Sequence, residues 1–391
     1  TTQVWNLYRL LINAVICNQK CLSEKLKIIF QTGIYQPYRS LYGNNTMKLS
    51  ILNLVPVREG QDHSQAMAAM VRLAQAAEQM GVERYWIAEH HNMKNLASSA
   101  TALLIQHTLA HTQSLRVGSG GVMLPNHSPY VGAEQYGTLE TLYPKRVELG
   151  LGRAPGTDRR TALALRRGRE HFDFPAEIAE LRGYFDNSNG VSAYPAAGMN
   201  VPFYILGSST ESAYLAAELG LPYAFASHFA PRMLEMAVEI YRKYFKPSPH
   251  LAEPYVIIGV NAIVADSDDE AQMLATTQTQ FFLNVVTNAQ QNLQPPVANV
   301  NEVWHHYRQA SQAPHFGPVD LNELPIYQQE REMVEQMTAC SLIGSPISVA
   351  HQLNALRDKI HFDEIMAVSY IFDEAKQIQS YRLLKEIVDG Q

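Results

Sequence analysis

The chain has 391 residues, of which 46% are hydrophobic and 17% charged, and its formal net charge is −6. This composition is typical of a soluble globular protein with a sizeable core. The negative charge gives no reason to expect nucleic acid or an acidic membrane surface as a partner. Cys17, Cys21 and Cys340 do not form a disulfide framework or a metal knuckle, so we expect a reducing, cytoplasmic environment.

The first 46 residues differ in character from the rest of the chain. They hold five basic residues and one acidic residue, Glu24, together with one short apolar run, Leu10–Ile16. That run is far too short to span a bilayer, and no clean small-residue cleavage site follows it. We therefore expect Met47 to be the natural start. Residues 1–46 then form an extension outside a single domain that covers residues 47–391.

From Met47 onward, aliphatic runs typical of strands alternate with amphipathic runs typical of helices. The predicted strands are Leu49–Val55, Arg84–Ala88, Leu115–Ser119, Arg146–Leu151, Pro202–Leu206, Pro222–Ala226, Val256–Val264 and Glu364–Ser369. The predicted helices are Ser64–Met80, Thr101–His111, Tyr130–Leu142, segments up to about Phe185, Glu211–Leu219, Pro231–Phe245, Asp268–Val286, Pro346–Lys359 and Ala375–Val388. Eight β-then-α units in a row predict an α/β fold, a closed (β/α)8 TIM barrel, because an open doubly wound sheet normally has fewer units.

A long segment, residues 288–337, separates the seventh strand and its helix from the eighth strand. It is rich in Gln, Asn, Pro and aromatic residues. A connection of this length in a compact domain is usually functional, so we interpret it as an insertion that covers the site as a lid. A surface insertion without a function is the alternative.

Active sites of such barrels lie at the carboxyl ends of the strands. Polar and glycine residues follow five of the predicted strands at that end. They are Glu89, His90, His91 and Asn92 after the second, Gly120, Gly121, Asn126 and His127 after the third, Gly152 and Arg153 after the fourth, Gly207–Ser212 after the fifth, and Ser227 and His228 after the sixth. These residues are the candidates for binding and chemistry.

The residues after the fifth strand predict a phosphate site. Gly207 lets the backbone approach a ligand, Ser208, Ser209 and Ser212 offer hydroxyl groups, and a helix with free N–H groups begins there. Arg153, one strand away, would add a charge-assisted hydrogen bond. The alternative is ordinary helix N-capping, which needs only one of the serines.

Two other kinds of site are not favoured. The run Gly150–Gly156 is one residue longer than the dinucleotide motif G-x-G-x-x-G, contains a proline, and has no suitably placed acidic residue about twenty positions later. Glu89, His90 and His91 are too closely spaced for a typical barrel metal site, and the pair His107 and His111 has no evident third ligand. We expect no nicotinamide site and no metal site.

Together these strand ends resemble the bacterial luciferase-like, flavin-dependent monooxygenase family, in its broad subgroup of mostly unassigned substrate. The resemblance extends from Met47 to the end of the chain. Its motifs are Tyr85–Asn92, Ser119–His127, Gly150–Asp158, Gly207–Ser212 and Gly344–Pro346. The combination of motifs is specific, although no single motif is.

The resemblance implies an FMN bound on the strand ends of a (β/α)8 barrel. It implies a non-prolyl cis peptide at Gly120–Gly121, where the absence of side chains leaves space for the isoalloxazine ring. The family's phosphate contacts correspond to Arg153, Ser209 and Ser212, with Ser208 adjacent. The family's catalytic histidine corresponds to His90.

Two positions depart from the light-emitting members of the family. Those members have a reactive cysteine just before the phosphate arginine, where this chain has Gly152, so bioluminescence with a long-chain aldehyde becomes doubtful. They have a tryptophan where this chain has His228 after the sixth strand. We therefore expect His228 to contribute a different wall to the cofactor pocket.

The activity that the resemblance implies is an FMN-dependent monooxygenase. Reduced FMN would react with O2 through a C4a-peroxyflavin and oxidise a small hydrophobic organic substrate, and a separate flavin reductase would supply the reduced cofactor. A homodimer is also possible, because relatives often dimerise through early helices. The alternatives are an F420-dependent hydride-transfer oxidoreductase, a non-catalytic flavin-binding protein of the same fold, and a metal-dependent hydrolase on a barrel.

Overall fold

The computed structural model describes residues 47–166, 172–310 and 325–391, and each structural statement below concerns these residues. Residues Thr46–Asp389 belong to one compact unit. The predicted extension, residues 1–46, and part of the predicted insertion, residues 311–324, lie outside the described residues.

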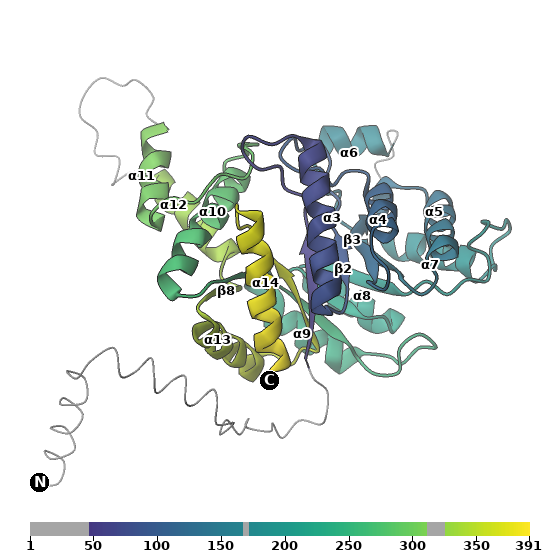
Figure 1. Cartoon of the computed structure of the whole chain (residues 1–391). Helices are drawn as coiled ribbons and strands as arrows, with labels where there is room; N and C mark the ends of the chain where they lie inside the picture. The colour runs from purple at the N-terminus through teal and green to yellow at the C-terminus, as the bar shows by residue number, and fades with distance from the viewer. Residues whose placement is uncertain (1–46, 167–171, 311–324) are drawn as a thin grey trace, which may run out of the picture. The chain divides into compact units, whose positions relative to one another are not determined.

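The described strands form one parallel sheet that closes on itself (Figure 1). The strands are β1 (Lys48–Asn53), β2 (Tyr85–Ile87), β3 (Val117–Met123), β4 (Val147–Gly152), β5 (Phe203–Gly207), β6 (Tyr223–Phe225), β7 (Val256–Val264), β8 (Ser341–Gly344) and β9 (Glu364–Val368). Around the barrel the order is β1, β2, β3, β4, β5, β6, β7 and β9, and β9 pairs with β1. The predicted (β/α)8 barrel is confirmed.

Helices connect successive strands and form the outer layer. They are α3 (His63–Met80), α4 (Thr101–Ala110), α5 (Pro129–Leu142), α6 (Arg159–Leu165), α7 (Phe174–Phe185), α8 (Thr210–Leu219), α9 (Leu234–Tyr244), α10 (Asp268–Val286), α11 (Val300–Ala310), α12 (Pro325–Met337), α13 (Pro346–Lys359) and α14 (Glu374–Asp389), with short 3₁₀ turns η1 (Leu124–Asn126) and η2 (Pro231–Met233). Figure 1 shows α3 and α14, the first and last described helices, side by side on this layer. Arg72 and Glu374 join them through an ion pair at 2.6 Å.

The connection between β7 and β9 is more structured than the sequence predicted. The expected insertion, residues 288–337, contains α11 and α12, and the unpredicted strand β8 follows it. Asn261 of β7 pairs with Ser341 of β8 on one side and with Val368 of β9 on the other. Strand β8 therefore lies on the same side of β7 as β6, which pairs with residues nearer the amino end of β7. A run of four residues is too short for its hydrophobic period to distinguish a strand from a loop.

Strand β3 extends beyond its predicted end at Ser119. It continues to Met123, with a register shift against β4 between Ser119 and Val122. Gly120 and Gly121 therefore lie within this strand and not after it. Glycine is depleted in strands, which explains why the sequence pattern placed the end of the strand too early.

Alternation along the strands divides the core into two layers. Leu49 and Ile51 of β1 face outward and pack with the inner faces of the helices, whereas Leu52 belongs to a second cluster inside the barrel. This is the two-residue period of a strand. Helix α3 shows how local sequence sets the outer layer: Asp62 and Gln65 form a capping box at its start, and Gly81 ends it in the left-handed conformation.

Charged side chains close the barrel interior at its amino-terminal end. Arg84 lies 3.0 Å from Glu148 and 3.0 Å from Glu364, and these side chains are at most 3% exposed. Trp86 donates to Glu148 at 2.8 Å, and the Tyr255 hydroxyl donates to Glu364 at 2.6 Å. Because a buried charge without its partner is strongly destabilising, the cluster serves the fold, and the opposite end of the barrel is left for a site.

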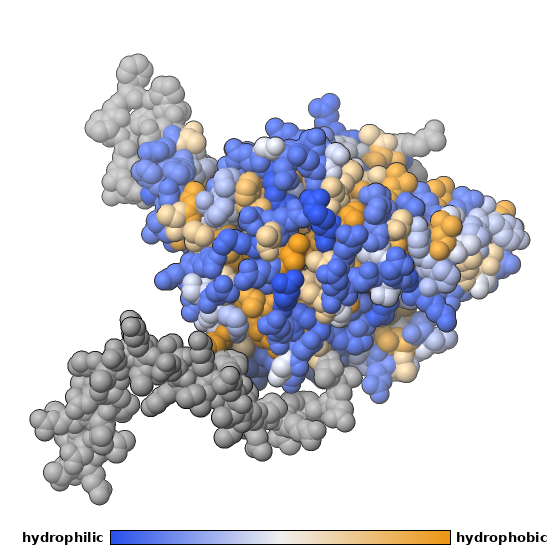
Figure 2. All heavy atoms as spheres, in the orientation of Figure 1, coloured by the Kyte–Doolittle hydropathy of each residue, from blue (hydrophilic) through white to orange (hydrophobic). Residues whose placement is uncertain are grey.

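None of the described helices combines the length and apolar character needed to cross a bilayer. Figure 2 shows a face of the molecule on which hydrophobic residues are scattered among hydrophilic ones.

Two glycines in helix α5 have opposite surroundings. A β-carbon added at Gly137 would lie 2.6 Å from the backbone of Ala196. One added at Gly132 would have Leu181 as its nearest neighbour, at 3.8 Å. The first glycine is therefore required by close packing, and the second is not.

We expect Gly137→Ala to lower the free energy of unfolding by about 1–3 kcal/mol, because the segment around Ala196 must move. Gly132→Ala in the same helix should raise it by up to about 1 kcal/mol, because alanine is the better helix former. Urea denaturation followed by circular dichroism measures both. Equal effects of the two substitutions would contradict this account of the packing.

Candidate active site

A cavity of about 500 Å³ lies at the carboxyl ends of the barrel strands. The residues that the sequence predicted and that line it are His90, Gly120, Arg153, Gly207, Ser208, Ser209, Ser212 and His228. Gly121 is not in the wall, because it packs against the carbonyl group of Gly150, 2.7 Å from where its β-carbon would be. Of the residues to which the sequence assigned a role in catalysis or cofactor binding, the structure places all except Gly121 in the wall of one cavity.

One side of the cavity, which we call the polar end, consists of Arg153 and Gly207–Ser212. Ser209 is the N-cap residue of α8, but its side chain makes no capping hydrogen bond. Ordinary N-capping therefore does not account for the serines. A β-carbon at Gly207 would collide with the Ser212 hydroxyl, so the close approach of these two residues requires glycine.

The hydroxyl groups of the polar end differ in their partners. The Ser212 hydroxyl donates to the Ser209 carbonyl oxygen at 2.7 Å and lies 2.9 Å from the Tyr223 hydroxyl. The hydrogen bond from the Ser209 side chain is the largest cause that lowers the pKa of Glu211, and the Arg153 charge lowers it further. The first turn of α8 leaves backbone N–H groups free for an anion, as any helix start does.

Gly120 of β3 forms the floor of the cavity. The Gly120–Gly121 peptide is cis, which confirms the expectation from the family resemblance. A β-carbon at Gly120 would lie 2.5 Å from Leu52 and 3.0 Å from Trp86. At this point only glycine fits beneath the cavity.

His90 and His228 face the cavity from opposite sides of the barrel. His90 follows β2 and His228 follows β6, and these strands are four positions apart in the closed order of eight. Burial lowers the pKa of His90, although a hydrogen bond to the backbone of Gly156 opposes the shift. Burial, with a smaller effect of His90, lowers the pKa of His228 to about 4. Both imidazoles are therefore neutral at pH 7.

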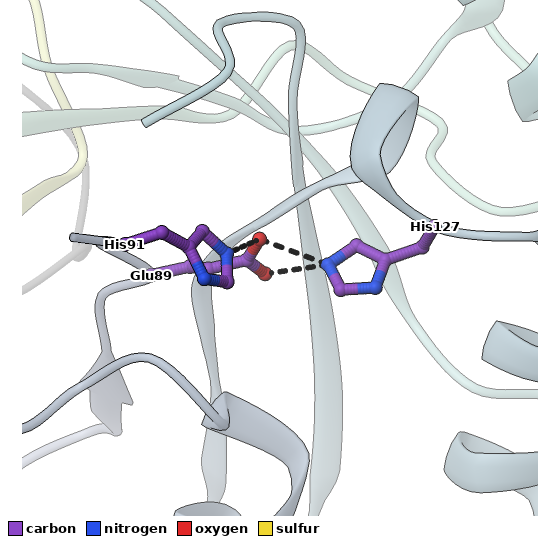
Figure 3. A group of neighbouring side chains, drawn as sticks. All are labelled: Glu89, His91 and His127. Atoms are coloured by element: carbon purple, nitrogen blue, oxygen red, sulfur yellow. Dashed lines mark hydrogen bonds and ion pairs between the residues drawn. The ribbon is translucent and has the colours of Figure 1, made fainter. Parts of the chain in front are cut away.

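The sequence predictions missed a hydrogen-bonded network at Glu89, directly beside His90. Figure 3 shows the Glu89 carboxylate between the rings of His91 and His127. Oε1 of Glu89 lies 2.9 Å from Nε2 of His91 and 2.8 Å from Nε2 of His127. The N–H of Met123 donates to Oε2 at 3.3 Å. Burial by itself would raise the pKa of Glu89, but the hydrogen bonds from His127 and His91 lower it to about 2.

This network joins the loops after β2 and β3, and neighbouring contacts extend it to the loop after β4. The His91 N–H donates to the Gly156 carbonyl oxygen at 3.2 Å, and the Thr157 hydroxyl donates to the His91 carbonyl oxygen at 2.9 Å. The ligand atoms of Glu89, His91 and His127 lie within 4.8 Å of one another, which is close enough for a cation. Because the carboxylate already accepts three hydrogen bonds, we interpret the group as a support for the loops that carry His90 and Arg153.

The other side of the cavity, which we call the apolar end, is formed by hydrophobic and aromatic side chains. They are Phe281, Phe282 and Val285 of α10, Met337 of α12 and Tyr370 after β9. The rings of Phe281 and Tyr370 stack with their centroids 4.3 Å apart. Strand β4 precedes Arg153 of the polar end, and β9 precedes Tyr370 of the apolar end. These two strands lie across the barrel from each other in the closed strand order, so the apolar end faces the polar end. No sequence motif pointed to these helix residues.

Comparison with known proteins identifies the family of this chain. The family model of luciferase-like monooxygenases matches residues 47–361, which is most of the chain. The chain belongs to the luciferase-like monooxygenase family. A luciferase-like monooxygenase of Escherichia coli (strain K12) is 42% identical over 349 residues, covering 88% of this chain and 98% of that protein.

Two solved structures share the fold. The structure of apo-MsnO8 has a TM-score of 0.75 and 32% identity, and covers 88% of this chain and 99% of that one. The oxygenating constituent of 3,6-diketocamphane monooxygenase from Pseudomonas putida, a type II Baeyer–Villiger monooxygenase in complex with FMN, has a TM-score of 0.63 and 17% identity, with 88% and 97% coverage. The second likeness is one of fold alone.

We expect Glu89→Gln to destabilise the protein at neutral pH, because the neutral amide is a weaker partner for the two imidazoles. A fall in pKa from 4.5 to about 2 corresponds to roughly 3 kcal/mol of stabilisation by the carboxylate. This stabilisation is fully present above the ordinary pKa of 4.5 and is lost as the pH falls toward 2. Urea denaturation at several pH values should show the gap between wild type and variant narrowing with acid.

The matched control is Glu235→Gln on the exposed surface of α9. It removes the same charge without a buried network, so its effect should stay within about 0.5 kcal/mol. A pH-independent gap for Glu89→Gln would show that the carboxylate charge does not support the loops.

Proposed function

We propose that this protein is an FMN-dependent monooxygenase that oxidises a small hydrophobic organic molecule with O2. The observation that supports this most directly is the division of one cavity into a polar end suited to a phosphate group and an apolar end suited to a hydrophobic substrate. Membership of the luciferase-like monooxygenase family supports a flavin as the group that spans the two.

The residues present fit FMN. The Arg153 guanidinium, the Ser208 hydroxyl and the backbone N–H groups at the start of α8 would hold the phosphate, and Ser209 and Ser212 would join by exchanging their present hydrogen bonds. Gly120 would leave room for the flat ring, and Gly207 for the approach of the backbone. His228 would border the ring on the side of β6. When bound, reduced FMN supplies the electrons that activate O2.

His90 is the proposed catalytic residue, because it combines a position on the cavity wall with a neutral imidazole. A neutral imidazole can accept a proton at one nitrogen and donate one from the other, which is what proton transfer beside a reacting group requires. The Glu89 network would keep His90 in place. The apolar residues of α10 and Met337 would exclude water from the reacting groups. Met337 belongs to the predicted insertion, residues 288–337, which is the proposed cover.

The reduced cofactor would come from a separate flavin reductase, because no nicotinamide-binding motif occurs in the sequence. The alternative cofactor, F420, has a longer anionic tail than FMN. Among the described residues that line the cavity, Arg153 is the one with a formal positive charge. This favours FMN over F420.

We expect Arg153→Ala to weaken FMN binding about 10- to 100-fold, because a charge-assisted contact to the phosphate is lost. Riboflavin lacks the phosphate, so its affinity should change by less than about twofold. Fluorescence titration of oxidised FMN and riboflavin measures both, and Arg382→Ala on the exposed surface of α14 is the matched control. Equal losses for FMN and riboflavin would show that Arg153 does not contact the phosphate.

The oxygen reaction is tested by loading the protein with reduced FMN anaerobically and mixing it with O2. We expect oxidised-flavin absorbance to return more slowly than for free reduced FMN, because the cavity excludes water. His90→Asn should leave FMN affinity within about twofold and change this rate at least about tenfold.

Each other outcome of this experiment contradicts a definite part of the proposal. FMN binding with unaltered reoxidation would favour a flavin carrier, and binding of F420 in place of FMN would favour hydride transfer. Absence of flavin binding would exclude the cofactor. Direct oxidation of NADH or NADPH by the pure protein would exclude the separate reductase.

A further inference from the structure

The distribution of charge in the cavity restricts what can bind beside the flavin. Among the described residues that line it, Arg153 and Glu211 carry a formal charge, and both belong to the polar end. The apolar end is made of Phe281, Phe282 and other uncharged side chains. A buried ligand charge without a countercharge is costly, so a charged substrate would be rejected there.

One polar side chain stands at the boundary of the two ends. His228 follows β6, which lies between β5 and β7 in the barrel. The loop after β5 forms the polar end of the cavity, and β7 leads to α10 of the apolar end. The residue is 7% exposed, and its Nδ1 atom has no hydrogen-bond partner in the part of the chain that the structure describes. Nδ1 has no surface that a ligand could reach, so the ring nitrogen available to a ligand is Nε2.

The surrounding residues hold this ring in place. Asn261 donates to the His228 carbonyl oxygen at 2.7 Å, and the Ser227 hydroxyl donates to the Gly259 carbonyl oxygen at 2.6 Å. A β-carbon at Gly259 would collide with Nδ1 of His228, so the position of the ring depends on glycine in β7. Nδ1 is therefore sealed against β7, and His228 lines the cavity with the rest of its ring.

We propose that His228 selects the substrate: an uncharged molecule with an apolar body against Phe281, Phe282 and Tyr370 and one polar group hydrogen-bonded to the His228 ring. This inference rests on the proposed function, because it assigns the polar end to the flavin phosphate. A neutral imidazole can donate to a carbonyl oxygen or accept from a hydroxyl group, so ketones, aldehydes and alcohols fit. A carboxylate could accept the same hydrogen bond, but its charge would lack a countercharge at the apolar end.

Three probes of nearly equal shape test the proposal: benzylacetone, a ketone; isopentylbenzene, a hydrocarbon; and hydrocinnamate, a carboxylate. Calorimetric titration is done with the full chain, both with and without oxidised FMN. We expect hydrocinnamate to bind at least about 100-fold more weakly than benzylacetone. His228→Phe should weaken benzylacetone about tenfold and leave isopentylbenzene unchanged or tighter.

Two further variants keep the test decisive. Gly259→Ala displaces the ring while His228 itself remains, and should lower the affinity for the ketone and not for the hydrocarbon. His107→Phe makes the same exchange on the exposed surface of α4 and should change neither affinity. Circular dichroism confirms folding, and if His228→Phe does not fold, Gly259→Ala carries the test.

The outcomes separate this inference from the proposed function. Hydrocinnamate binding as tightly as benzylacetone, or equal changes for ketone and hydrocarbon in the folded variants, would overturn the role of His228. Failure of all probes to bind a protein that does bind FMN would overturn it as well. Binding of the probes to a protein that does not bind FMN would support the pocket and contradict only the flavin assignment.

Discussion

The close approach of β3 and β4 is the constraint on which the rest of the structure depends. A β-carbon at Gly121 would lie 2.7 Å from the carbonyl oxygen of Gly150, and one at Gly150 would collide with the carbonyl oxygen of Ser119. Without these carbons the strands stay paired through a shift in register. Gly120 then lies beneath the cavity without a side chain. The shape of the cavity floor thus depends on the absence of side chains at these glycines.

Buried charge organises both ends of the barrel, in different ways. At the amino-terminal end, Arg84 pairs with Glu148 and Glu364 inside the barrel. At the carboxyl-terminal end, the buried carboxylate of Glu89 is satisfied by imidazoles from two loops, so the charge connects segments around a cavity. In each case a buried carboxylate is tolerated because hydrogen bonds replace its hydration. The cluster around Arg84 packs inside the amino-terminal end of the barrel, whereas the network around Glu89 connects the loops that surround the cavity.

The cavity combines two demands that are hard to meet in one place. In the proposed function, a phosphate group needs positive charge and N–H donors, which Arg153 and the start of α8 would provide. A protected reaction needs an apolar cover, which α10 and α12 would provide. The polar end and the apolar end are kept apart because they lie on opposite sides of a closed barrel. His90 and His228 lie between them, and burial keeps both neutral, so neither adds a charge to the apolar side.

The sequence by itself determined the barrel, its eight principal strands and the residues at their carboxyl ends, including Arg153 and His90, because hydrophobic period and strand-end glycine are local signals. It left β8 and the full length of β3 unpredicted, since a four-residue strand and a glycine-rich strand lack a readable period. Only the tertiary structure decided that Glu89 lies between His91 and His127 and that helix α10 supplies the apolar wall. Those contacts join segments that closure of the barrel brings together, and no local pattern records them.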